Sequence, residues 1–153
     1  MRFLLTIIFI FSVCTVQAKN DIKYTGYEIG NRYKLLQSFI ADYEVENGGP
    51  ILDGKVSIYK TNNNNNKCVL VSKIDGDSGV YGTETILYFY NSKVLYGYYV
   101  NYNYIFLNGE GSIKLNKVNY ENPESENSLI ELKKEFSRYI SNISKNTLRK
   151  CSN

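Results

Sequence analysis

The pattern of apolar and polar residues along this chain of 153 residues changes its period twice. Over 31–46, apolar residues recur at spacings of three and four, which would place them on one face of a helix. Asn31 fits the N-cap position, and Gly48-Gly49-Pro50 would stop the helix. We therefore predict an N-terminal helix over 31–46, with a strand as the alternative because the run is short. The stripe consists of Leu36, Phe39, Ile40 and Tyr43.

From Lys55 to Tyr120 the period is two, as in strands that bury one face and expose the other. Short polar segments separate the apolar runs, and Asn91-Ser92 fits a two-residue hairpin turn. Because the connections are short, neighbouring strands should pair antiparallel in sequence order. We predict an antiparallel β-meander of about five to six strands within 55–120.

A helical period returns over 129–143, where apolar residues stand at steps of three and four, the stripe of an amphipathic helix. Ser128 and Glu131 have the spacing of a capping box at its start. The stripe needs an apolar surface, and the open face of the sheet offers one. We therefore expect an α+β fold, with this helix packed on the sheet and a polar tail, 144–153, behind it. The stripe consists of Leu129, Leu132, Phe136, Ile140 and Ile143.

The first eighteen residues have the pattern of an export signal. Arg2 precedes an almost unbroken apolar run, and Val16-Gln17-Ala18 supplies the small residues of a signal-peptidase site. The run is too short for a membrane-spanning helix, and no later segment approaches about 20 apolar residues. We expect a signal peptide over 1–18, cleavage after Ala18, and a single domain over 19–153 that works in the periplasm or the extracellular space.

The three cysteines bear on both processing and stability. A lipoprotein would be acylated on Cys14, but the branched Val13 directly before it fits that cleavage poorly, so no lipid anchor is expected. After removal of the leader, Cys68 and Cys151 remain, and an even number in an oxidising compartment favours a disulfide. It would close a long loop and hold the polar tail on the sheet, a constraint of about 4.5 kcal/mol on the chain-entropy model. Two unpaired thiols are the alternative.

Charge and composition argue against several functional classes. The predicted leader carries one of the 18 basic residues and none of the 15 acidic ones, so 19–153 has a net charge of +2. This charge is too weak and too mixed to indicate a nucleic-acid partner. Histidine is absent, which removes the usual general base of serine proteases and a common zinc ligand. No cofactor and no metal are expected.

The segment 75–79, Asp-Gly-Asp-Ser-Gly, resembles short motifs of proteases and of calcium loops, but we interpret it as a turn. The serine lacks a histidine, and a calcium loop would need Gly and Glu where the chain has Val80 and Ile86. Candidate acids and bases for catalysis all lie in or beside predicted turns, so we do not expect an enzyme. These candidates are Asp75, Asp77, Glu84 and Glu110.

Tyrosine is the most unusual component, with 15 Tyr beside 7 Phe and no Trp. Strand alternation over 93–107 would place seven residues on one face: Val94, Tyr96, Tyr98, Val100, Tyr102, Tyr104 and Phe106. Tyrosine is favoured in recognition surfaces because it offers wide, stiff contact area with a hydroxyl for orientation. The alternative is cross-strand aromatic packing beneath a helix. Both interpretations stay open, with Tyr96, Tyr98, Tyr102 and Tyr104 as the candidate binding residues.

The segment Tyr88-Phe89-Tyr90-Asn91-Ser92-Lys93-Val94-Leu95 resembles a hairpin of small exported bacterial proteins of unassigned function. In those proteins two aromatic positions, an Asn or Asp turn and Lys-Val/Leu build a meander flanked by helices. The resemblance implies an α+β meander and transfers no catalytic residue. In size and composition the chain is also similar to periplasmic immunity proteins and enzyme inhibitors.

These features together predict a non-enzymatic exported protein that acts by binding another protein, as an inhibitor or an immunity-type protein does. Two other classes are kept as alternatives. One is a structural component of the envelope or surface that self-associates through strand edges. The other is a hydrolase that uses the carboxylates of the predicted turns.

Overall fold

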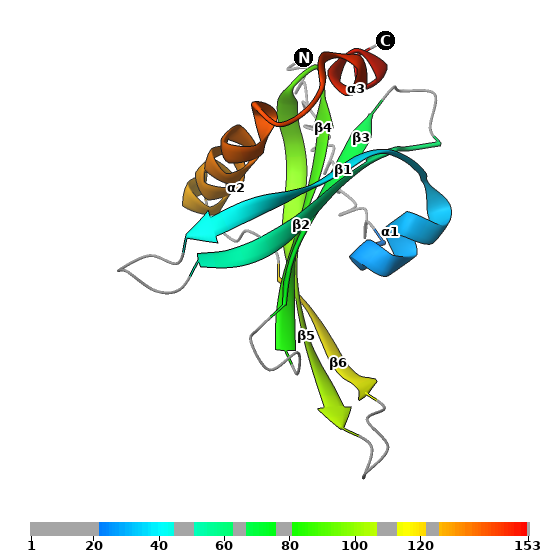
Figure 1. Cartoon of the computed structure of the whole chain (residues 1–153), viewed down its shortest axis with the longest axis vertical. Coiled ribbons are helices and arrows are strands. Elements are labelled where there is room, and N and C mark those ends of the chain that lie inside the picture. The colour runs from blue at the N-terminus through cyan, green and yellow to red at the C-terminus, as the bar shows by residue number, and fades with distance from the viewer. Residues whose placement is uncertain are drawn as a thin grey trace, which may run out of the picture.

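The computed structural model describes residues 22–44, 51–62, 67–75, 81–106, 113–121 and 126–152. These residues form three helices and six strands (Figure 1). In sequence order the elements are α1 (Gly26–Arg32), β1 (Lys34–Glu44), β2 (Ile51–Lys60), β3 (Cys68–Asp75), β4 (Tyr81–Tyr90), β5 (Lys93–Phe106), β6 (Ile113–Glu121), α2 (Glu126–Ile140) and α3 (Lys145–Lys150).

The six strands form one open sheet in the order β1-β2-β3-β4-β5-β6, and each neighbouring pair is antiparallel. The predicted α+β meander is therefore confirmed. Between β4 and β5, Asn91 and Ser92 have φ values of 46° and 59°. Two successive residues with positive φ are typical of the type I′ turn, whose twist suits a two-residue hairpin. This is the turn that the sequence predicts.

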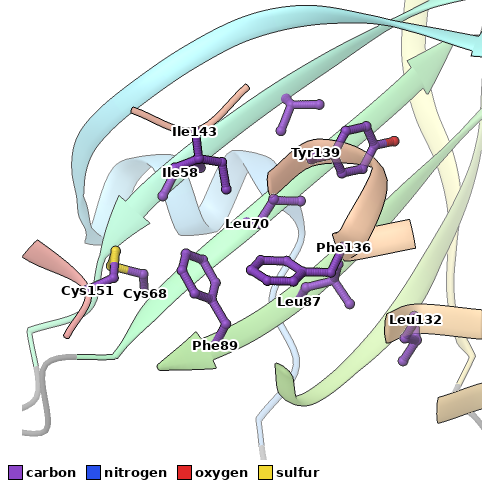
Figure 2. Close-up of a cluster of buried hydrophobic side chains, with 11 residues drawn as sticks. Ile58, Cys68, Leu70, Leu87, Phe89, Leu132, Phe136, Tyr139, Ile143 and Cys151 are labelled. Carbon is purple, nitrogen blue, oxygen red and sulfur yellow. A yellow bond between two sulfur atoms is a disulfide. The ribbon is translucent and has the colours of Figure 1, made fainter. Parts of the chain in front are cut away.

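One face of the sheet is covered by α2 and α3 (Figure 1). Leu132 and Phe136 of α2 are 0% and 3% exposed. The ring of Phe136 lies 4.9 Å from the ring of Phe89 on β4, measured between centroids, and the two rings meet in the middle of the cluster (Figure 2). These contacts confirm the predicted packing of the C-terminal amphipathic helix on the sheet.

A disulfide anchors α3 to the same face. Cys68 at the start of β3 and Cys151 directly after α3 are joined with an S–S distance of 2.04 Å, and both residues are fully buried (Figure 2). The predicted pairing is confirmed. The N–H of Asn91 also donates to the carbonyl of Cys151 at 3.1 Å. The segment predicted as a polar tail, 144–153, therefore contains a helix that Ser144 caps and that the disulfide holds.

The opposite face of the sheet carries α1 (Figure 1). Ile29 of α1 is fully buried there and packs on side chains of the strands that point to this face. The alternate side chains of the same strands point to the other face and form the core under α2, as the period of two requires. With seven residues, α1 is too short to cover the whole face. The uncovered part contains the candidate site.

The predicted helix over 31–46 is wrong. Lys34–Glu44 form strand β1, and the helix that precedes it, α1, ends at Arg32. Helix α1 begins before the predicted start, so an N-terminal helix exists but is displaced along the chain, and over 34–44 the strand alternative holds.

A bulge in β1 explains why the sequence imitates a helix. The register of β1 against β2 shifts between Leu35 and Gln37, which leaves Leu36 as an extra residue. Leu36 and Phe39 therefore pack on the same core although they are three residues apart. Ile40 does not share their face and is 61% exposed. A bulged strand with one exposed isoleucine thus has the spacing of a helical stripe.

Two bounds of the C-terminal helix also differ from the prediction. Helix α2 begins at Glu126, so Ser128 lies inside its first turn and is not its N-cap. The helix ends at Ile140 rather than at 143. Residues 1–21 lie outside the described residues, so the signal peptide, the cleavage after Ala18 and the unmodified Cys14 stay predictions. None of the described helices has the length and apolar character needed to cross a bilayer.

Candidate functional site

A cavity of about 390 Å³ opens on the face of the sheet that α1 partly covers. Volumes of roughly 300 to 1,000 Å³ are typical of small-ligand pockets. Its walls come from the start of α1 and from the five strands β2 to β6. The lining residues are Thr25, Gly26, Tyr27, Lys55, Ser57, Tyr59, Val71, Lys73, Glu84, Tyr102 and Val118.

The start of α1 is fixed by a capping box. Thr25 Oγ1 accepts the N–H of Glu28 at 3.3 Å, and Glu28 Oε2 accepts the N–H of Thr25 at 2.8 Å. The hydroxyl of Tyr98 on β5 holds the preceding residue: it accepts from the N–H of Tyr24 and donates to its carbonyl, both at 2.9 Å. These bonds set the position of α1 over the sheet and so define one wall of the cavity.

Gly26, the first residue of α1, approaches β3 and β4 more closely than any other residue type would. A Cβ atom at this position would lie 2.7 Å from Val71 Cγ1 and 2.9 Å from Glu84 Oε1. The absence of a side chain lets the N–H of Gly26 donate to Glu84 Oε2 at 2.6 Å. The glycine therefore allows a backbone N–H to form a hydrogen bond with the buried carboxyl group.

Glu84 is the buried acid of the cavity. It lies in the middle of β4 and is 6% exposed, so it is not beside a turn as the sequence suggests. Burial raises the pKa of the Glu84 carboxyl group. The N–H of Gly26 and the charge of Lys73 oppose this shift, whereas the nearby acids add to it, but burial is the largest cause.

Lys73 is the cross-strand neighbour of Glu84, but its ion pair is with Asp75. Its Nζ lies 3.1 Å from Asp75 Oδ1. The same oxygen accepts the hydroxyl of Tyr102 at 2.5 Å, and the ammonium group of Lys73 lies 5.4 Å from the centre of the Tyr102 ring. Asp75 thus orients both the lysine and the tyrosine at one end of the cavity.

We use the term rim for three large exposed apolar side chains on this face: Tyr27 beside the cavity, and Ile40 and Tyr120 on the two edge strands. Tyr27 on α1 lines the cavity and is 78% exposed. Ile40 on β1 is the cross-strand partner of the lining residue Lys55 and therefore shares its face. Burial raises the pKa of Tyr120 on β6, and the charges of Glu28 and Glu84 add to this shift. Ile40 is 61% exposed and Tyr120 39%.

The structure separates the four predicted binding tyrosines. Tyr98 and Tyr102 are 3% and 5% exposed: Tyr98 packs in the core of the α1 face, whereas Tyr102 lines the cavity. Tyr96 is 41% exposed and stacks on Tyr88 across the hairpin at 4.4 Å between ring centroids. The side chain of Tyr104 lies outside the described residues. Tyr98 is hydrogen-bonded to the backbone of Tyr24, and Tyr102 lies over Gly82.

Irregular pairing also divides the predicted tyrosine face. Tyr88 pairs with Tyr96 but Phe89 pairs with Val94, so Leu95 is an extra residue in β5. As a result Val94 packs with the α2 face, whereas Tyr98 packs with the α1 face. A second register shift, between Asn103 and Tyr104, leaves its extra residue in β6 and not in β5. Strict alternation over 93–107 is therefore wrong at Leu95.

Of the four candidate catalytic acids, Glu84 lines the cavity and Asp75 lies at its edge, bonded to Tyr102. Asp77 and Glu110 lie outside the described residues. Within the described ranges, no three His, Cys, Asp or Glu side chains are grouped so that they would hold a metal ion.

A second cavity of about 310 Å³ lies between α2 and the other face of the sheet. Glu135 and Arg138 of α2 line it together with Thr85 of β4. Burial raises the pKa of Glu135, and the hydroxyls of Thr85 and Tyr139 and the charge of Arg138 oppose this shift. Among the described residues no buried side-chain nitrogen or oxygen atom lacks a hydrogen-bond partner, so this cavity presents no unsatisfied buried group.

Sequence reasoning missed the start of α1 and the role of Gly26. The signal was present as Thr25-Gly26-Tyr27-Glu28, which has the Thr-x-x-Glu spacing of a capping box. The contact between Gly26 and Glu84 joins residues 58 positions apart, and no local pattern reports such a contact.

The chain matches no protein-family model, no curated protein and no solved structure. Its function has to be argued from the cavity and the rim.

Proposed function

We propose that this protein is exported and acts, without catalysis, by binding another protein through the rim and the cavity of the α1 face. An inhibitor or an immunity-type protein acts in this way. The observation that carries the proposal is the rim: large apolar side chains from α1, β1 and β6 are exposed on the face that carries the cavity. Apolar side chains gathered in this way mark interaction sites, whereas scattered ones need no explanation.

The chemistry of the rim supports a protein partner. Two of its three members are tyrosines, which supply broad contact area at low entropic cost and are enriched in protein interfaces. A hollow beside exposed aromatic side chains also suits the usual arrangement of interfaces, in which a few anchors of one protein fill pockets of the other.

Two further observations support export and a non-catalytic role. The disulfide between Cys68 and Cys151 fits an oxidising compartment, in agreement with the predicted signal peptide. In the cavity, Glu84 is the lone lining carboxylate among the described residues, and acid–base catalysis by carboxylates commonly uses two of them with different pKa values.

Site-specific photo-crosslinking tests the proposal. A photoreactive amino acid is placed at Tyr27 on the rim or, as a control, at Ile130, which is 60% exposed on α2. Each protein is exposed to the periplasmic and extracellular fractions of the producing cells. We expect a saturable crosslink to one protein from position 27 and none from position 130.

Replacement of Tyr27 by Ser should weaken capture of that protein at least tenfold, while Ile130→Ser should not change it. Crosslinks between copies of this chain, together with light scattering that shows concentration-dependent assembly, would favour the structural class instead. Equal crosslinking from both positions, or none from position 27, contradicts the proposal.

A further inference from the structure

We infer that the cavity receives the basic side chain of a partner protein, with its ammonium or guanidinium group hydrogen-bonded to Glu84. That the cation belongs to a partner protein rests on the proposed function. That the cavity binds a cation does not. Three features support it: the acceptor capacity of Glu84, the aromatic walls of the cavity, and the lysine and arginine side chains that already lie over tyrosine rings on this face.

Glu84 has acceptor capacity that the described residues leave unused. An ionised carboxylate has two oxygens and about four acceptor positions. Among the described residues, the N–H of Gly26 is its hydrogen-bond donor, through Oε2. Glu84 lines the cavity, so a donor group that enters the cavity reaches the carboxylate. A buried carboxylate with one donor is costly, and a cation would offset that cost.

Aromatic rings on this face already lie beside positive charges. The ammonium group of Lys23 lies 5.8 Å from the ring centre of Tyr98, and the guanidinium group of Arg32 lies 4.3 Å from that of Tyr24. Lys73 stands in the same relation to Tyr102. The negative face of an aromatic ring attracts cations in this way. Tyr27 and Tyr59 line the cavity and offer further rings to an incoming cation.

Two lysines line the cavity and have to be weighed against this inference. Lys73 is paired with Asp75 at 3.1 Å, so part of its charge is neutralised at the end of the cavity. Lys55 is exposed and belongs to the mouth. An anionic ligand would have to approach Lys55 while facing the buried carboxyl group of Glu84. Charge complementarity inside the cavity therefore favours a cation.

The size of the cavity favours a whole side chain over a simple ion. A volume of about 390 Å³ holds an alkyl chain as well as its charged end, and Val71 and Val118 give that chain apolar walls. A lysine or arginine side chain has this combination of an apolar stem and a charged tip. The exposed rim would then contact the surface from which the side chain projects.

Nuclear magnetic resonance titration of the full chain tests the inference. The probes are N-acetyl-lysine methylamide and N-acetyl-arginine methylamide, with the norleucine and glutamate analogues as neutral and acidic controls. We expect saturable shifts of the Gly26 amide, which donates to Glu84, with the two basic probes. Glu84→Gln should weaken their binding at least tenfold, and Glu131→Gln on exposed α2 should leave it unchanged.

A second variant keeps the test informative if Glu84→Gln does not fold. Lys55→Glu changes an exposed side chain and should strengthen binding of the basic probes, because it replaces a repelling charge at the mouth by an attracting one. Stronger binding of the acidic probe, equal binding of all four probes, or no saturable shift below about 10 mM overturns the inference.

The test separates this inference from the proposed function. Binding of the basic probes without a crosslinked partner at Tyr27 keeps the amine-binding cavity and rejects the protein partner, which leaves free amines as the source. A partner captured equally well by the wild type and by Glu84→Gln keeps the proposed function and rejects the inference.

Discussion

Glu84 and Gly26 show how two residues create a polar site inside an apolar layer. The glycine has no Cβ, so its N–H reaches the carboxyl group at 2.6 Å. Lys73, the neighbour that would most readily neutralise the acid, is directed to Asp75. Burial is therefore the largest influence on the carboxyl group and raises its pKa, although the N–H of Gly26 and the charge of Lys73 oppose the shift.

We predict that Glu84→Gln stabilises the protein more at pH 7.5 than at pH 4. The pKa of Glu84 is raised in the folded state above its ordinary value of about 4.5, so the unfolded chain loses its proton first as the pH rises. The wild type should lose stability between the unfolded and the folded pKa, and glutamine has no such titration. Urea unfolding at several pH values measures the difference.

The matched control for this experiment is Glu131→Gln, which removes a carboxylate from the exposed surface of α2. A stability difference between Glu84→Gln and the wild type that is the same at pH 4 and pH 7.5 would contradict the raised pKa.

Among the elements, α2 depends most on burial of its stripe. Phe136 lies against Phe89 at the centre of the first core and is 3% exposed. We expect Phe136→Ala to lower the free energy of unfolding by about 3 to 5 kcal/mol, through lost transfer energy and the cavity left behind. Thermal and urea unfolding measure this change.

Ile130→Ala on the same helix is the control, because Ile130 is 60% exposed and its truncation should alter stability by less than about 0.5 kcal/mol. If both variants unfold at the wild-type urea concentration, the packing of α2 on the sheet is incorrect.

The elements also show what local sequence determines. The stripe of α2 and the Asn91-Ser92 turn were predictable because each depends on residues within a few positions of one another. Strand β1 was not, because its bulge at Leu36 brings two apolar residues three positions apart onto one face. The cavity was beyond local reasoning, since it depends on the pairing of five strands and on the contact from Gly26 to Glu84.

At the scale of the whole molecule, the sheet has a closed face and an open face. Two helices and the disulfide close the first, and the short α1 leaves part of the second uncovered (Figure 1). Both faces carry a buried core, and the proposed binding surface is confined to the uncovered part of the α1 face, so substitutions on the rim should be tolerated by the fold.

The disulfide should contribute strongly to the stability of the whole domain. It joins residues 83 positions apart and fixes α3 on the sheet. We expect the double variant Cys68→Ala with Cys151→Ala to lose about 2 to 5 kcal/mol of unfolding free energy. Lys145→Ala, an exposed change in α3, serves as the control. Mass spectrometry should show a gain of two hydrogens when the wild type is reduced, and a wild-type mass that reduction leaves unaltered would show that the bond is absent.

The close approach of Gly26 to Glu84 restricts how this chain can diverge. Any side chain at position 26 would strike Val71 as well as the carboxyl group of Glu84, so a descendant that gains one there must change both neighbours. The three positions should therefore change together during evolution. Distant relatives with the same pocket should have the sequence Thr-Gly-x-Glu before their first strand and an acidic residue within their fourth strand. These two features together would distinguish them from the many proteins that share only the antiparallel meander.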